Sequence, residues 1–288
     1  MDLKERLHSH LIQFVRDRNP YLASAGHFYV QQYIREELGQ WGTVAIDDFA
    51  VRGRIYHNFI LDLPPLNPPL AKGGKQENLP IIIIGAHYDT VPGTPGADDN
   101  ATGVAVLLEL ARAIALQPLK YPVQLVAFDM EEAGCLGSKH YAAKFKQQQQ
   151  SIRLMISLEM LGYCDRTPNS QNYPAGLKYF YPNIGNFIAL IGNLRTVRDM
   201  ISLSGNIRKS GQACEWLPVP NRGLIVPDTR RSDHAPFWDN NYPAIMVTDT
   251  ANMRNPHYHQ ASDKIETLDL DFLAGVSQGL VEAIKNIR

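Results

Sequence analysis

From residue 81 onward, short runs of apolar residues alternate with longer segments of helical periodicity. The predicted buried strands are 81–87 (IIIIGAH), 123–130 (VQLVAFDM), 154–161 (LMISLEML) and 243–250 (PAIMVTDT). The predicted helices are 102–116, 139–150, 194–207 and 270–287. Continuous apolar strands separated by helices are typical of a sheet buried on both faces. The sequence therefore predicts an α/β fold, a three-layer α/β/α sandwich around a mostly parallel, mixed central sheet.

The chain before this alternation has its own pattern. Apolar residues recur at helical spacing over residues 3–15 and again over residues 28–38, a series that starts at Phe28. This spacing predicts two amphipathic helices. Residues 43–51 and 54–63 are strand-like and are separated by Arg-Gly, which predicts a β-hairpin.

Two stretches are less regular. Residues 65–79 are rich in Pro, Gly and Lys and predict an exposed loop insertion. Residues 161–240 have a weak pattern around one helix, and long irregular stretches in compact domains are often functional. We expect a substrate side-chain pocket from residues 161–225. No internal repeat is present, and we predict a single domain over residues 1–288.

Composition restricts the partners. The 28 basic and 29 acidic side chains are mixed along the chain, so we expect neither nucleic acid nor an anionic membrane to bind. Three cysteines without metal-finger spacing argue against a disulfide framework and leave room for one disulfide at most. No segment resembles a signal peptide, and no apolar run approaches the roughly 20 residues of a membrane span. We predict a cytoplasmic protein, and nothing here indicates its oligomeric state.

Each of three predicted strands ends in side chains that can bind metal. His87 and Asp89 follow the first strand, Glu131 and Glu132 follow the next, and Glu159 belongs to the third. Ligands of open α/β sheets bind outside the carboxyl ends of the strands, so these side chains can converge. Carboxylates gathered there repel one another unless a cation compensates them. Histidine and carboxylate ligands suit zinc, cobalt or manganese.

Six short motifs occur in an order that resembles a known family. They are HYD (87–89), GADDNATG (96–103), MEEAGCLGS (130–138), SLEMLGY (157–163), SDHAPF (232–237) and YHQASD (258–263). Together they resemble the zinc-dependent aminopeptidases, whose relatives include glutamate carboxypeptidases and glutaminyl cyclases. The resemblance implies the zinc-peptidase type of fold, similar to phosphorylases and hydrolases, and makes residues 1–288 a single metallopeptidase catalytic domain.

The resemblance also implies a ligand set for two zinc ions. His87 and Glu159 would bind one ion, Glu132 and His259 would bind the other, and Asp99 would bridge them. The better-known aminopeptidases carry aspartate where this chain has Glu159, which is one methylene longer, so the occupancy of that site stays open. A cis peptide bond after Asp99 is implied as well.

Three further residues receive roles. Glu131, beside a ligand, would be the general base that takes a proton from water and passes it to the leaving amine. Asp89 would orient the imidazole of His87 through the other ring nitrogen. Tyr258 would donate a hydrogen bond to the oxyanion of the tetrahedral intermediate. Of the neighbouring polar residues, Asp233 and His234 are expected to lie beside the ligands or to contact substrate.

The leading hypothesis is a metal-dependent exopeptidase, a co-catalytic two-zinc aminopeptidase that acts on the N-terminal residue of peptides. Two alternatives use the same residues: a carboxypeptidase, or a glutaminyl cyclase with one zinc ion. A third alternative, from another class, is an inactive relative that binds metal or peptide. The adjacent Glu131 and Glu132 favour hydrolysis over cyclisation.

Overall fold

One mixed sheet forms the centre of the protein. The computed structural model describes residues 1–66, 79–174 and 176–287. The strands are β1 (Val44–Val51), β2 (Arg54–Leu63), β3 (Ile81–His87), β4 (Val123–Phe128), β5 (Ile152–Glu159), β6 (Ile188–Asn193), β7 (Cys214–Val219) and β8 (Ala244–Thr248). Their order across the sheet is β1-β2-β4-β3-β5-β8-β6-β7. Apart from its ends, the predicted insertion at 65–79 lies outside the described residues.

The middle of the sheet is parallel and its margins are mixed. β4, β3, β5 and β8 run parallel to one another, and helical crossovers connect β3 to β4 and β4 to β5. β1 and β2 form the predicted hairpin, and β2 adds to β4 in antiparallel orientation. On the other side, β6 is antiparallel to β8 and parallel to β7. Four of the seven pairings are thus parallel, which confirms the predicted mixed sheet.

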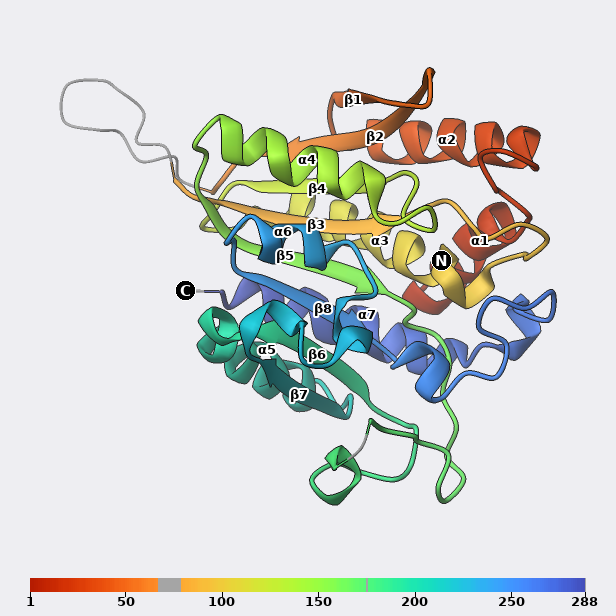
Figure 1. Cartoon of the computed structure of the whole chain (residues 1–288), viewed down its shortest axis with the longest axis vertical. Coiled ribbons are helices and arrows are strands. Elements are labelled where there is room, and N and C mark those ends of the chain that lie inside the picture. Colours follow the sequence, from red (N-terminus) through yellow and green to blue (C-terminus); the bar gives the residue numbers. More distant parts are fainter. Residues whose placement is uncertain (67–78, 175, 288) are drawn as a thin grey trace.

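Helices cover both faces of this sheet (Figure 1). They are α1 (Leu3–Phe14), α2 (Ser24–Gly39), α3 (Gly103–Leu116), α4 (Leu136–Gln147), α5 (Val197–Lys209), α6 (His234–Asp239) and α7 (Leu270–Lys285). The larger core cluster joins α1, α2, α3, α5 and α7 to one face, and a second cluster joins α4 and α6 to the other. The predicted three-layer sandwich is confirmed.

The prediction of secondary structure and burial from the sequence was wrong in two places. Residues 161–240 are more regular than expected, because β6, β7 and the short helix α6 lie within them beside α5. β7 is an edge strand, and its middle residues are only half-buried. It therefore lacks the continuous apolar run by which the inner strands were found. In α2, Phe28 is 61% exposed, whereas Val30, Ile34 and Leu38 of the same predicted series are buried as expected.

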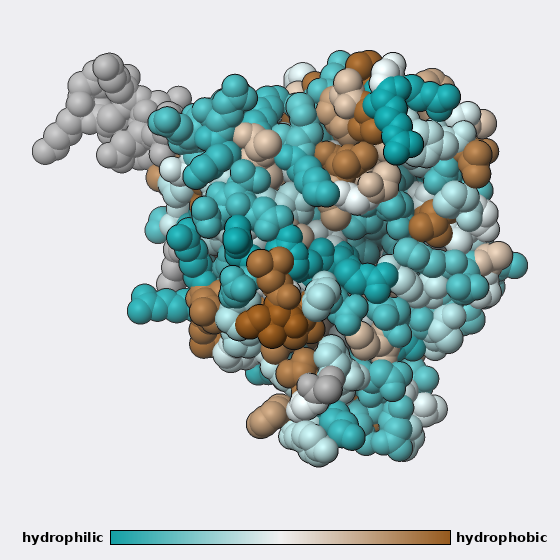
Figure 2. Space-filling view, viewed as in Figure 1, coloured by the Kyte–Doolittle hydropathy of each residue, from teal (hydrophilic) through white to brown (hydrophobic). Residues whose placement is uncertain are grey.

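On the face that Figure 2 shows, hydrophilic residues cover most of the surface, and hydrophobic residues form separate patches. Within the described ranges, no helix is both long enough and apolar enough to cross a bilayer. Cys135, Cys164 and Cys214 are all free thiols.

Candidate metal centre

The carboxyl ends of the parallel strands bring the predicted residues together. His87 is the last residue of β3, and Glu159 is the last residue of β5, its neighbour. Glu131 and Glu132 follow β4, the neighbour of β3 on the other side. Asp99 lies in η1 (Ala97–Thr102), a π-helical turn that leads into α3. Parallel strands end at the same edge of a sheet, so the fold itself gathers these side chains.

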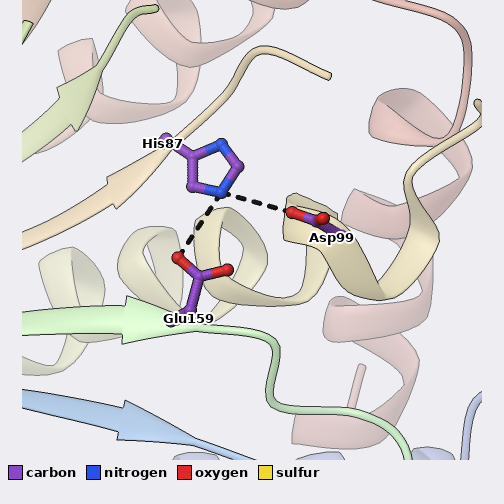
Figure 3. Close-up of side chains that lie close together, drawn as sticks. All are labelled: His87, Asp99 and Glu159. Carbon is purple, nitrogen blue, oxygen red and sulfur yellow. Dashed lines mark ion pairs between the residues drawn. The ribbon is translucent and has the colours of Figure 1, made fainter. Parts of the chain in front are cut away.

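A first group of three side chains surrounds Nε2 of His87 (Figure 3). Oδ1 of Asp99 lies 3.3 Å from this nitrogen, and Oε2 of Glu159 lies 3.5 Å from it. All three side chains are buried. Figure 3 shows that His87 and Glu159 extend from neighbouring strand ends, while Asp99 points toward them from η1.

A second group shares Asp99 with the first. Oδ2 of Asp99 lies 3.0 Å from Nε2 of His259, and Oε2 of Glu132 lies 3.2 Å from the same nitrogen. Asp99 therefore faces one group with each carboxylate oxygen. The five residues expected as ligands are all brought together by the structure, in the two groups that the resemblance implies. The peptide bond between Asp99 and Asn100 is cis, as expected.

Burial and mutual repulsion perturb the carboxylates. Burial raises the pKa of Glu132 to about 7, and the charge of Asp99 adds to this effect. Burial likewise raises the pKa of Glu131 well above its ordinary value. Burial opposes ionisation of Asp99 as well, but the neighbouring imidazoles of His259 and His87 outweigh it and lower the pKa of Asp99. The cluster thus requires compensating positive charge, which a divalent cation would supply.

The side chains present fit such a cation. Among the described residues, neither ring nitrogen of His87 has a hydrogen-bond partner, nor does Oε1 of Glu132, although all three atoms are buried. Buried polar atoms in proteins are nearly always satisfied, so unpartnered polar atoms in a cluster indicate a missing partner. Imidazole nitrogens with carboxylate oxygens and no thiolate suit Zn²⁺, and also Co²⁺ or Mn²⁺.

Glu131 lies beside this cluster without belonging to either group of ligands. Its Oε2 is 4.0 Å from Nε2 of His87, and its side chain is 12% exposed. The thiol of Cys135 lies 3.3 Å from the other oxygen, Oε1, and donates to it. One carboxylate oxygen of Glu131 is therefore held, and the other faces the cluster.

Asp89 makes more contacts than its expected role, to orient the imidazole of His87, requires. Oδ1 of Asp89 lies 3.5 Å from Nδ1 of His87, which is long for a hydrogen bond. The same carboxylate accepts the backbone N–H groups of Glu131 and Glu132, at 3.0 Å and 3.2 Å. Asp89 thus connects the end of β3 to the turn that follows β4.

Tyr258 lies at the margin of the second group. Its ring stacks on the imidazole of His259, with 3.8 Å between ring centroids. Its hydroxyl accepts a hydrogen bond from Nη2 of Arg231 at 3.0 Å. Burial raises the pKa of Tyr258, which keeps the phenol protonated. The hydroxyl hydrogen is therefore available to a further acceptor.

A cavity opens beside the cluster, with Glu159 and Tyr258 in its wall. β6 and β8 form its floor through Ala189, Met246 and further side chains, while α5 covers the other face of β6. Its apolar and aromatic lining is Tyr173, Leu177, Tyr181, Phe187, Ala189, Ile191, Trp216, Leu217, Met246 and Met253. Most of this lining comes from residues 161–225, where the pocket was expected.

Sequence reasoning missed several polar residues that hold the cluster. Ser232 donates to Oε2 of Glu159 at 2.7 Å. Asp263 accepts the backbone N–H groups of Asp98 and Asp99, at 2.9 Å and 3.1 Å. Both residues stand inside motifs that carry the resemblance, but neither their type nor their spacing indicates a partner. A third, Arg18, donates to backbone carbonyls on both sides of the loop between His87 and Asp99, and no sequence signal indicates it.

Comparison with known proteins identifies the family of this chain. Residues 70–284 match the family described as Peptidase family M28. The chain belongs to this family. It is 36% identical over 270 residues to an uncharacterized Escherichia coli protein, YfbL, covering 88% of this chain and 79% of that protein. It is 28% identical over 239 residues to leucine aminopeptidase 1 of Trichophyton equinum, covering 76% of this chain but only 54% of the longer relative.

Solved structures of this M28 fold superpose on most of the chain. The LapA aminopeptidase of Legionella pneumophila gives a TM-score of 0.72 at 20% identity, covering 98% of this chain and 71% of LapA. A glutaminyl cyclase of Bacteroides thetaiotaomicron gives 0.70 at 18% identity, covering 99% and 97%. At such identities the likeness shows the fold, and both kinds of enzyme share it. The expected membership of a zinc-aminopeptidase family is confirmed, and the glutaminyl cyclase shares the fold.

Proposed function

We propose that this M28 peptidase is a two-zinc aminopeptidase that releases N-terminal residues from peptides. The carboxylate of Asp99 carries the proposal, because its Oδ1 faces His87 and its Oδ2 faces His259. A carboxylate with a ligand group at each oxygen suits a pair of ions about 3.5 to 4 Å apart. Family membership supports hydrolysis of a peptide bond.

In this proposal, His87 and Glu159 hold one ion, Glu132 and His259 hold the other, and Asp99 serves both. When bound, zinc supplies a Lewis acid that polarises the scissile carbonyl and lowers the pKa of water. Cobalt or manganese would suit the same ligands.

The general base is Glu131. Because Cys135 holds Oε1, the oxygen Oε2 is the one that takes a proton from the attacking water. The same carboxyl group then delivers this proton to the nitrogen of the leaving amine, as the C–N bond breaks. Burial raises the pKa of Glu131, which makes this carboxylate a stronger base.

Two neighbours assist this base. Asp89 keeps Glu131 and Glu132 at a fixed position relative to His87 through their backbone N–H groups. Tyr258 donates its hydroxyl hydrogen to the oxygen that becomes negative in the transition state, and Arg231 holds that hydroxyl in place.

The cavity beside the cluster receives the N-terminal side chain, and its lining favours a large apolar one. Two acids, Glu215 and Asp228, also border it. Glu215 pairs with Arg208 at 3.1 Å, and Asp228 lies 3.7 Å from Arg231. Because each acid already has a cationic partner, neither favours a basic substrate residue.

A matched pair of variants tests the proposal. Glu131→Gln removes the base but no ligand, so kcat for leucyl p-nitroanilide falls by about 10²- to 10⁴-fold while zinc content stays near two ions per chain. The exposed Glu36→Gln serves as the control and retains full activity. Unchanged hydrolysis by Glu131→Gln would contradict the assigned base.

The same assay separates the alternatives. Glutaminyl cyclase activity is the second candidate, because an enzyme of that activity shares the fold. One zinc ion per chain, with ammonia released from an N-terminal glutaminyl peptide, would favour the cyclase. Cleavage only at the C-terminus would favour a carboxypeptidase. Bound zinc without any hydrolysis would favour an inactive binding protein.

We further propose a peptide as the substrate, a cytoplasmic location and a single catalytic domain over residues 1–288. The continuous eight-stranded sheet supports the single domain, since both ends of the sheet share one core cluster.

A further inference from the structure

The segment between α1 and α2 contacts the loop that carries the candidate ligands. This segment precedes residues 70–284, the part of the chain that matches the family. α1 packs against η1, the turn that contains Asp99. Figure 1 shows the red α1 beside the yellow segment in which η1 leads into α3. Arg18, just beyond α1, is fully buried with 0% exposure.

All the polar contacts of the Arg18 side chain go to backbone carbonyl oxygens. Nε donates to Tyr88 O at 2.7 Å, and Nη1 donates to Pro95 O at 2.7 Å. Nη2 donates to Gly96 O at 2.8 Å and, more weakly, to Asp99 O at 3.4 Å. Two longer bonds from Nη1 reach carbonyls of the N-terminal segment itself. The guanidinium therefore touches the loop at both of its ends.

The residues on either side of Arg18 bind the same loop. Oδ2 of Asp17 accepts the backbone N–H of Gly93 at 2.9 Å. Nδ2 of Asn19 donates to Thr90 O at 2.9 Å, and the backbone N–H of Arg18 donates to the hydroxyl of Thr90 at 3.1 Å. Three consecutive side chains thus hold the loop over its whole length.

We propose that Arg18 is a positioning residue of the metal centre, and that its guanidinium fixes the loop at residues 88–99 so that His87 and Asp99 meet as ligands. Tyr88 directly follows His87, and Pro95 and Gly96 lie just before Asp99. A single planar group therefore sets the separation of two ligands that are 12 positions apart in the sequence. This inference rests on the proposed function, because it requires the metal centre.

The chemistry of arginine suits this task, and lysine could not replace it. The guanidinium presents five N–H donors in a rigid plane, so it binds several carbonyls in fixed directions at once. A lysine ammonium has three donors on a flexible stem and does not define such a plane. Gly96 leaves the space that this packing needs, because a Cβ there would lie 3.0 Å from Nη1 of Arg18.

The test measures metal binding rather than activity. Arg18→Lys and Arg18→Met are compared with the wild type by competition for zinc with a chromogenic chelator. Cobalt absorption spectra then report ligand geometry. Residues that orient metal ligands typically change affinity by about 10- to 100-fold, and we expect a weakening of this size with altered cobalt bands. Arg18→Lys should recover only part of the loss.

A second buried residue controls for general destabilisation. Leu38→Ala truncates a fully buried side chain near the end of α2, the helix that packs against α1, α3, β1 and β2. The contacts of α2 to Tyr88 come from His27 and Gln31, about two or more turns before Leu38. Leu38→Ala should lose thermal stability yet bind zinc like the wild type.

Should Arg18→Met fail to fold, Asn19→Ala removes the bond to Thr90 O, together with the bonds that its Oδ1 accepts from the N–H groups of Tyr21 and Leu22. This variant should weaken zinc binding by a few fold.

The possible outcomes separate the two proposals. Unchanged zinc affinity and cobalt spectra in both Arg18 variants would overturn the positioning role and leave the proposed function standing. Equal weakening in Leu38→Ala would overturn it too, since the effect would then follow stability alone. A wild-type protein that binds neither metal would overturn the proposed function itself.

Discussion

The backbone N–H of Glu131 donates a hydrogen bond to Oδ1 of Asp89 at 3.0 Å, across 42 positions of sequence. This bond joins the loop after β3 to the turn after β4. The other oxygen of Asp89 accepts the N–H of the next residue, Glu132, at 3.2 Å. One buried carboxylate therefore sets the position of both glutamates relative to the end of β3.

Asp89→Asn tests this arrangement. Asparagine has one acceptor oxygen, and its NH₂ group cannot accept, so one of the two N–H groups loses its partner. We expect kcat/KM for leucyl p-nitroanilide to fall by about 10- to 100-fold at saturating zinc. The exposed Asp62→Asn, in β2, provides a control that should behave as the wild type. Equal kcat/KM in Asp89→Asn would show that the two bonds do not matter for activity.

Glu159→Asp tests whether this ligand needs its length. Oε2 of Glu159 lies 3.5 Å from Nε2 of His87 and accepts a hydrogen bond from Ser232 at 2.7 Å. Removing a methylene withdraws the carboxylate by about 1.5 Å, one C–C bond. We expect zinc content after dialysis to fall from two ions to one per chain, as measured by elemental analysis. Ser232→Ala, which leaves the ligand intact, should retain more zinc, and two ions in Glu159→Asp would refute the requirement.

Ala189→Phe tests the side-chain pocket. Ala189 is on β6, in the cavity floor, and a phenyl group there would occupy the space offered to a substrate side chain. Differences of one or a few methylenes in a pocket change kcat/KM by about 10- to 200-fold. The ratio of kcat/KM for leucyl over alanyl p-nitroanilide should therefore fall within that range. Ile201→Phe, exposed on α5, should leave the ratio unchanged, and an unchanged ratio in Ala189→Phe would mean that the cavity holds another part of the substrate.

The elements that the sequence predicted well are those whose burial is complete. β3 reads as IIIIGAH and all but its first residue are buried, so composition alone identifies it. β7 reads as CEWLPV and lies at the edge, where one side is only partly covered. Its proline and glutamate are compatible with an edge strand but typical of a loop as well. A prediction that depends on burial therefore fails to identify half-buried edge strands.

The residues of the candidate site likewise differ in how well the sequence predicts them. His87 and Glu159 could be placed because a strand end fixes where a side chain points, and topology then brings strand ends together. Arg18 could not be placed, since its acceptors are carbonyl oxygens, which every residue carries. Those contacts depend on the path of a loop in three dimensions, and no local spacing encodes them. The residues that hold the ligands in place were therefore harder to predict from the sequence than the ligands themselves.

His234, at the start of α6, makes stability depend on pH. The imidazole is fully buried, packs edge-on against Trp238 and donates from Nε2 to Thr229 O at 2.8 Å. Burial lowers the pKa of His234 from 6.5 to about 4. In the unfolded chain the same group binds a proton near pH 6.5, so between these values the unfolded state binds more protons than the folded state.

The stability from neutral His234 should therefore be complete above pH 6.5 and should decline as the pH falls toward 4. A pKa difference of this size corresponds to about 3 kcal/mol at most. His234→Gln keeps a donor for Thr229 O but cannot titrate. Its free energy of unfolding, measured by urea denaturation, should lose less than that of the wild type between pH 6.5 and 4. Parallel curves for the two proteins would show that His234 is protonated in the fold as readily as in the unfolded chain.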